Sequence, residues 1–265
     1  HIEAIDSNCE TFGTPGHFNL EFFFQPEGGK FVTKVCPVPA QPKVLIKEVE
    51  NKIKKKKDHH FSQSNNGVFG GLFLTTITGW LAPFKLAKNI VKPSISPLTS
   101  SSSKHMDPSA KLLIQGDGTA FEDGLQVGFT VDQMTDRLEG LLRSIGLVDH
   151  FAPLVYAVGH GSTSVNNTHY AGYDCGACSG RPGSVNARVI AWIGNNPEVR
   201  KKLKERGINI PFTTHFVGAL HDTSRDEIQF FDTDVLNESA LKLHEQKEQL
   251  FQKALANNAS ERSRR

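Results

Sequence analysis

The most reactive side chains of this sequence lie in one glycine-rich run, VGHGSTSVNNTHYAGYDCGACSG, at residues 158–180. The run contains two histidines, an aspartate and two cysteines: His160, His169, Asp174, Cys175 and Cys178. Imidazole and thiolate groups are ligands that Zn²⁺ binds in proteins. Glycine-rich loops also bind anions through exposed backbone N–H groups, or simply turn the chain. A zinc site is therefore one of several hypotheses for this run.

Three interpretations of this run remain open from the residues alone. In the first, the run is a turn or an anion-binding loop whose cysteines bind nothing. In the second, a closed structural zinc site is formed by His160, His169, Cys175 and Cys178. In the third, His160 and Cys175 belong to an open zinc site whose other ligands come from elsewhere, as catalytic zinc sites commonly do. A C-x-x-C pair is also a redox motif, but no thioredoxin-like context surrounds this one.

The sequence around the run alternates between strand and helix patterns. The apolar stretch LVYAV at 154–158 predicts a buried, parallel strand, with His160 just past its end. A capping-box pattern at Thr130 and a glycine at 146 predict a helix between them. Further helices are expected at 184–194 and 197–206, and strands at 17–24, 214–220 and 227–231. This alternation predicts an α/β fold with a mostly parallel sheet flanked by helices. In such sheets ligands gather at the carboxyl ends of strands, where His160 would lie.

Composition and charge place the chain among ordinary soluble globular proteins. Of its 265 residues, 38% are hydrophobic and 22% are charged, and the formal net charge is +2. A charge so near zero argues against nucleic acid or another polyanion as a partner. The four cysteines are too few and too scattered for the disulfide framework of a secreted domain, which favours reduced thiols.

We divide the chain into four parts. Residues 1–50 are expected to form the N-terminal part of the α/β core, and residues 51–109 an insertion. That insertion comprises a charged loop, an uncharged helix and a Ser/Pro-rich linker. Residues 110–235 would form the half of the core with the candidate zinc site, and residues 236–265 a polar helix. Because neither end resembles a natural terminus, we expect a piece of a longer protein, with a core incomplete at both ends.

The uncharged part of the insertion, residues 61–84, reaches the length at which a membrane span becomes possible. It contains several glycines and threonines and one proline, which make it less apolar than a typical span. We therefore expect 67–84 to be a helix that packs on the protein body or on a partner, without crossing a bilayer.

Long motifs in the chain resemble one known family. They are HIEAIDSNCETFGTPGHF, KVCPVPAQPK, LEGLLRSIGLVDHFAPLV, VGHGSTSVNN, YDCGACSGRPGSVNARVIAWIGNNPEVRKKLKERGINIP and TTHFVGALHDTSRDEIQFFD. Together they resemble the DabA family of probable inorganic carbon transporter subunits. The resemblance covers most of the chain and is weakest between about 50 and 110.

This resemblance implies a fold and a function. The family's large subunit is similar to a β-type carbonic anhydrase with one zinc ion. It works at the cytoplasmic face of the cell inner membrane, as a peripheral protein, with an integral membrane partner similar to the proton-pumping subunits of respiratory complex I. The pair is expected to take up inorganic carbon by hydrating CO2 to bicarbonate, driven by a cation gradient.

The resemblance also implies a ligand set. The family's zinc ligands are a Cys and an Asp of a Cys-x-Asp-x-Arg stretch, then a His and a Cys that correspond to His160 and Cys175. His169 and Cys178 correspond to no family ligand. Ser162 and Asp174 are adjacent to the ligands and are the candidates for hydrogen bonds to them. The sequence contains no Cys-x-Asp, so we expect that stretch upstream of His1 and expect this chain to be inactive alone.

Two alternatives to this carbon-uptake function stay open. One is a non-enzymatic, zinc-stabilised module that uses all four His and Cys residues of the run. The other is an interaction scaffold whose uncharged segment docks a membrane partner.

Overall fold

The computed structural model describes residues 1–49, 79–80, 83–84, 87, 106–162 and 174–264. The chain divides into two compact units, one of His1–Val49 with Ser101–Arg265 and the other of Glu50–Ser100. Most of the uncharged segment 67–84, and His169, lie outside the described residues, so the hypotheses about them stay untested. Within the described residues, no helix combines the length and apolar character needed to cross a bilayer.

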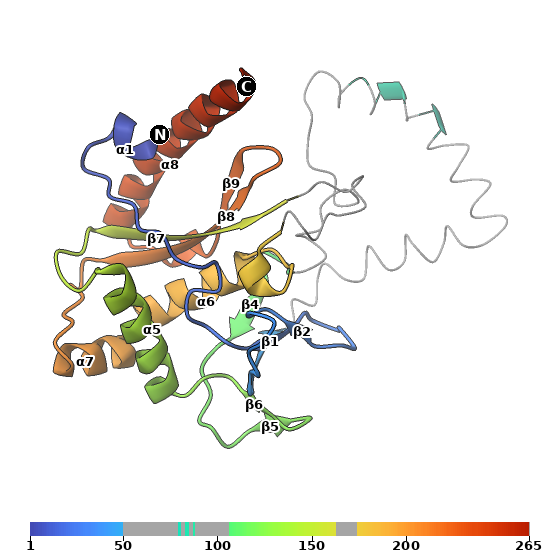
Figure 1. The fold of residues 1–265 in the computed structure, drawn as a ribbon, viewed down its shortest axis with the longest axis vertical. Coiled ribbons are helices and arrows are strands. Elements are labelled where there is room, and N and C mark those ends of the chain that lie inside the picture. Colours follow the sequence, from blue (N-terminus) through green and yellow to red (C-terminus); the bar gives the residue numbers. More distant parts are fainter. Residues whose placement is uncertain (50–78, 81–82, 85–86, 88–105, 163–173, 265) are drawn as a thin grey trace. The chain divides into compact units, whose positions relative to one another are not determined.

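The larger unit is an α/β fold, as the sequence predicts (Figure 1). Among the described residues, six strands form one sheet in the order β2-β1-β3-β6-β5, and β4 pairs with β3. These strands are β1 (Phe23–Gln25), β2 (Thr33–Lys34), β3 (Val44–Val49), β4 (Lys111–Leu113), β5 (Phe121–Glu122) and β6 (Leu125–Val127). The second sheet has the order β7-β8-β9, with β7 (Leu154–Gly161), β8 (His215–Asp222) and β9 (Glu227–Phe230).

Both sheets are mixed. Strand β3 is parallel to β1 and β6, and β7 is parallel to β8 as predicted. Strands β2, β4, β5 and β9 pair antiparallel with their neighbours. The expectation of a mostly parallel sheet is therefore corrected. Each antiparallel strand is short and lies beside a neighbour close in sequence or at the margin of a sheet, where no crossover helix is needed.

The helices begin and end where local signals place them. Helix α5 (Val131–Ile145) begins at Thr130 with a complete capping box and ends at Gly146 in the left-handed conformation. Helix α7 (Pro197–Glu205) is capped by Asn196. The remaining helices are α1 (Ile2–Ile5), α6 (Ser184–Asn195) and α8 (Glu238–Arg262), with short 3₁₀ turns η2 (Gly176–Cys178) and η3 (Thr233–Val235).

Helix α6 begins at Ser184 as predicted, with Gly183 in the N-cap position. One local prediction needs correction. The stretch 17–24 is a strand only from Phe23 onward. Phe18 and Asn19 have φ values of 51° and 60°, in the left-handed region, and an extended strand cannot continue through them.

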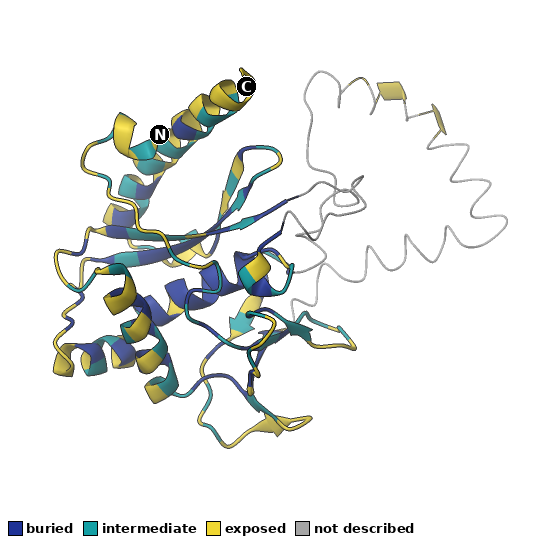
Figure 2. Cartoon of the chain, in the orientation of Figure 1, coloured by how far each residue is buried: buried dark blue, intermediate teal, exposed yellow. Residues whose placement is uncertain are grey.

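The β7-β8-β9 sheet is covered on both faces. Because side chains alternate along a strand, Val155 and Ala157 pack on the main core, whereas Leu154 and Tyr156 face α8. Helix α6 lies on the first face and is buried almost throughout (Figure 2). This double coverage explains the apolar run at 154–158. Val158 is nevertheless 39% exposed, and β7 extends to Gly161, so the strand is longer and less buried than predicted.

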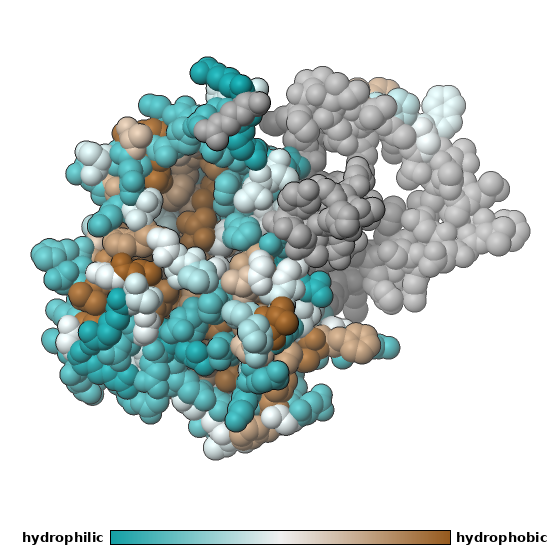
Figure 3. All heavy atoms as spheres, viewed as in Figure 1, coloured by the Kyte–Doolittle hydropathy of each residue, from teal (hydrophilic) through white to brown (hydrophobic). Residues whose placement is uncertain are grey.

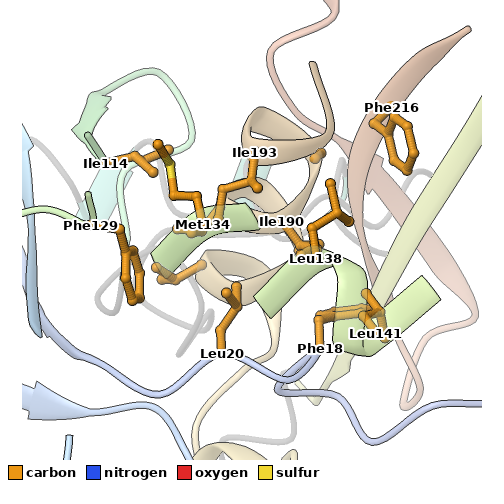
Figure 4. Close-up of a cluster of buried hydrophobic side chains, with 14 of the residues drawn as sticks. Phe18, Leu20, Ile114, Phe129, Met134, Leu138, Leu141, Ile190, Ile193 and Phe216 are labelled. Atoms are coloured by element: carbon orange, nitrogen blue, oxygen red, sulfur yellow. The ribbon is translucent and has the colours of Figure 1, made fainter. Parts of the chain in front are cut away.

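The main core joins segments that are far apart in the sequence. Its largest fully buried side chains include Leu20, Phe129, Met134, Leu138, Ile190 and Ile193. Figure 4 shows these residues converging from the N-terminal segment, the segment between β6 and α5, and helices α5 and α6. The face of the molecule in Figure 3 is mostly hydrophilic, with scattered apolar side chains. This core fixes α6, and therefore the loop that precedes it, against β7.

Candidate metal centre

Strand β7 presents His160 near its carboxyl end. The parallel register pairs His160 with His221 of β8, so the two imidazoles lie on the same face of the sheet. His221 Nε2 lies 3.5 Å from Asp226 Oδ1, an ion-pair distance. His160 instead contacts Cys175. The prediction that His160 marks the end of the best strand is correct, although it lies within the strand and not past it.

The loop 174–183 is clamped onto the end of β7 by backbone contacts. The Gly183 N–H donates to the His160 carbonyl over 2.9 Å, and the Cys175 N–H donates to the Arg181 carbonyl over 3.2 Å. A β-carbon on Gly159 would stand 2.4 Å from the Gly183 oxygen, so only glycine allows this approach. These backbone contacts place the Cys175 side chain next to the imidazole of His160.

His160 and Cys175 form a hydrogen-bonded imidazole–thiol pair. The hydrogen bond from Cys178, and then the one with His160, lower the pKa of the Cys175 thiol to about 5, although burial opposes them. The hydrogen bond with Cys175 raises the pKa of His160, again against burial. Both hydrogen bonds favour the thiolate form of Cys175, which is the form in which cysteine binds metals.

Cys178 lies directly beside this pair. Its side chain is hydrogen-bonded to Cys175, and its sulfur also lies 3.4 Å from the Gly16 carbonyl oxygen. The hydrogen bond with Cys175, together with burial, raises the pKa of the Cys178 thiol, so this sulfur keeps its proton. The structure thus distinguishes the two cysteines of the C-x-x-C by charge.

Asp174 and Ser162 also lie at the end of β7. The Ser162 N–H donates to Asp174 Oδ1 over 2.8 Å, and both residues are buried. Burial raises the pKa of Asp174 to about 6, while the Ser162 hydrogen bond and His160 oppose the shift. Their role as partners of metal ligands stays a prediction.

The N-terminal segment 10–17 crosses the site, which the sequence analysis did not foresee. A β-carbon on Gly16 would stand 2.6 Å from Cys175 Sγ and 4.0 Å from His160 Cδ2. Within the described part of the chain, Nδ1 of the neighbouring His17 is buried without a hydrogen-bond partner. Burial lowers the pKa of His17, and the charge of Cys175 opposes that shift. The run Gly13-Thr14-Pro15-Gly16 was the available signal, because glycine permits close backbone approach.

The described residues bring together too few donors to make up a metal site. Among them, no group of three or more His, Cys, Asp or Glu side chains is arranged to hold a metal ion. The donors that converge are one imidazole and one thiolate, which suit zinc in type. His169 lies outside the described residues, so the closed four-ligand site is not tested.

The comparisons with known proteins agree on one family. The model of the family "Probable inorganic carbon transporter subunit DabA" matches residues 1–265. The chain is 52% identical to a protein of that name from Azotobacter vinelandii, over 100% of this chain and 32% of the relative. It is 50% identical to one from Nitrosospira multiformis, over 100% of this chain and 29% of the relative.

A more distant relative has a name from the same family. The chain is 30% identical to "Probable inorganic carbon transporter subunit DabA 2" from Rhodopirellula baltica, over 100% of this chain and 26% of the relative. The chain thus spans about a third of the length of the curated relatives it matches. No solved structure matches it. Because the family model covers every residue, the chain belongs to the DabA family.

Proposed function

We propose that this chain carries half of the zinc site of a subunit that takes up inorganic carbon by hydrating CO2 to bicarbonate. The observation that supports the proposal best is the convergence of the His160 imidazole and the Cys175 thiolate at the carboxyl end of β7. The names of the relatives indicate inorganic carbon transport as the process. The β-carbonic-anhydrase-like core and the chemistry rest on the resemblance of the motifs.

His160 and Cys175 would hold the metal. They supply one nitrogen and one sulfur donor, and the resemblance assigns the other two donors to a Cys-x-Asp stretch that this sequence lacks. When bound, zinc supplies the Lewis acidity that lowers the pKa of a water molecule to about 7. To bind a metal, the imidazole and the thiol would have to give up the proton of the hydrogen bond that joins them.

The surrounding residues hold His160 and Cys175 in place and exclude water from them. Cys175 is 1% exposed, and segment 10–17 lies directly against its sulfur. The backbone bond from Gly183 to His160 fixes the end of β7. Exclusion of water strengthens the attraction between a thiolate and a cation. Asp174, buried beside the pair, is placed to accept a proton from a group in the site.

The proposal includes a partner and a location. An inorganic carbon transporter subunit works with other components, and we propose an integral membrane subunit similar to the proton-pumping subunits of complex I. The subunit would then be peripheral, on the cytoplasmic face of the inner membrane. Support for this part comes from the family resemblance and from the names of the relatives.

Metal analysis of the full-length protein tests the proposal. We expect about one zinc ion per subunit, lost in Cys175→Ser and retained in Cys178→Ser. The two variants are matched, because both remove one buried sulfur from the same turn. A wild-type protein without zinc would refute the proposal. Equal loss of zinc from both variants would instead favour the non-enzymatic, zinc-stabilised module with His169 and Cys178 as ligands.

A further inference from the structure

Cys178 has no role in the proposed zinc site, yet its position is closely specified. It is fully buried, at 0% exposure, and its side chain is hydrogen-bonded to Cys175. Both cysteines are free thiols in the structure. Two adjacent cysteine sulfurs can form a disulfide by oxidation, provided that the backbone holds the two residues close enough together.

The backbone between the two cysteines is a single 3₁₀ turn. The Cys178 N–H donates to the Cys175 carbonyl over 3.0 Å, which closes a turn from the first cysteine to the second. In 3₁₀ geometry the side chains of residues three apart lie on the same side of the helix. A disulfide needs Cβ atoms about 3.5–4.5 Å apart, and the turn together with the side-chain hydrogen bond places the two sulfurs side by side.

We propose that Cys175 and Cys178 form an oxidation site, which a small peroxide converts to a disulfide. In the first step the Cys175 sulfur attacks a peroxide oxygen. The S–O bond forms, the O–O bond breaks, and hydrogen peroxide leaves one water and a sulfenic acid. In the second step the Cys178 sulfur attacks the sulfenic sulfur, the S–S bond forms, and the second water leaves. Two thiols lose two electrons and two protons, and one peroxide is reduced to two waters.

The packing around the turn limits the size of the oxidant that can reach the two sulfurs and determines which cysteine can pair with Cys175. Segment 10–17 lies over the sulfurs, with Gly16 against Cys175, so a bulky oxidant cannot reach them without displacing backbone. The turn itself borders solvent, since Gly176 is exposed. Cys36 is a buried electrostatic neighbour of Cys178, and Ser179 Oγ donates to the Cys36 carbonyl over 2.6 Å, but the side chain hydrogen-bonded to Cys175 is that of Cys178. Cys178 is therefore the partner within reach of Cys175.

Closure of the disulfide would change the site. A disulfide sulfur carries no negative charge, so Cys175 would lose its charged hydrogen bond with His160. If the proposed zinc site is correct, oxidation would also remove one of its donors, and bound zinc would protect the thiolate. The disulfide chemistry itself uses no zinc, and the experiment below measures it on the metal-free protein.

The test is a thiol count on the purified, metal-free protein after treatment with hydrogen peroxide. The protein is quenched, denatured and alkylated with a maleimide, and the peptides are mapped by mass spectrometry. We expect two of the four cysteines to lose reactivity together, in one peptide lighter by two hydrogen atoms. A reductant should restore all four reactive thiols.

Two variants assign the bond. Cys178→Ser should abolish the cross-link and leave a sulfenic acid on Cys175 that a 1,3-diketone traps, whereas Cys36→Ser should form the same cross-link as the wild type. A wild-type protein that keeps four reactive thiols, or whose disulfide includes Cys9 or Cys36, would overturn the inference. The peptide map of the oxidised wild-type protein identifies the bonded cysteines even if a variant fails to fold.

Discussion

Gly16 lies so close to Cys175 that a β-carbon on Gly16 would stand 2.6 Å from the Cys175 sulfur. The contact joins an N-terminal segment to the middle of the chain and holds that segment over the imidazole–thiolate pair. Any side chain at position 16 must move either the segment or the sulfur.

Gly16→Ala should therefore destabilise the protein and disturb the pair. Overpacking of this kind costs about 1–3 kcal/mol. Gly13→Ala is the matched control, because a β-carbon on Gly13 would meet nothing within 4 Å. Chemical denaturation gives the change in unfolding free energy, and the alkylation rate of Cys175 reports its exposure. Equal behaviour of the two variants would show that segment 10–17 does not cover Cys175 tightly.

Carbon dioxide hydration should be absent from the 265-residue chain by itself. The sequence contains no Cys-x-Asp, and the described pair His160 and Cys175 provides two of the four donors that the resemblance implies. Two donors bind zinc weakly, because imidazole and thiol must first give up protons. Stopped-flow measurement of the pH change with added zinc checks this expectation. Clear hydration would mean that the donors are complete within the chain, with His169 or Cys178 as the leading candidates.

Acid should weaken the attachment of α1 to α8 through Asp6. The hydrogen bond from Lys247, and then the one from the Asn8 N–H, lower the pKa of Asp6 from its usual 3.8 to about 2. Since the folded pKa is the lower one, this stabilisation is present above about pH 4 and is lost as the pH falls toward 2. The difference in melting temperature between wild type and Asp6→Asn should shrink over that range. A difference that stays constant down to pH 2 would contradict it.

The turn between β8 and β9 should depend on Arg262. Buried Asp226 has a φ of 52° and accepts bonds from Arg262 and from Asn258, the latter 2.8 Å long. Arg262→Ala removes the charged hydrogen bonds to Asp226 and to the Thr223 carbonyl and should cost about 1–3 kcal/mol. Arg264→Ala is the control, as a second arginine of the same terminal turn. Thermal unfolding measures both variants, and equal melting temperatures would exclude a role for the Asp226 bond.

Local signals in the sequence determined much of the fold. Thr130, Gln133 and Gly146 defined α5 correctly, because caps and left-handed ends involve residues three or four apart. Asn196 did the same for α7. The strand at 17–24 was overestimated, because apolar composition does not reveal the left-handed backbone at Phe18 and Asn19.

The residue types of the candidate site were also apparent from the sequence, but their arrangement was not. Spacing alone left open whether His160 and Cys175 bind a metal with His169 and Cys178, bind it without them, or bind none. The tertiary structure brings Cys175 to His160, because the Gly183 bond to β7 and the close approach at Gly159 fold the loop back. It also places Gly16 over the sulfur and makes Cys178 the proton donor to Cys175. These contacts arise from the packing of α6 on β7 and β8 within a core drawn from the whole chain, and so no local pattern encodes them.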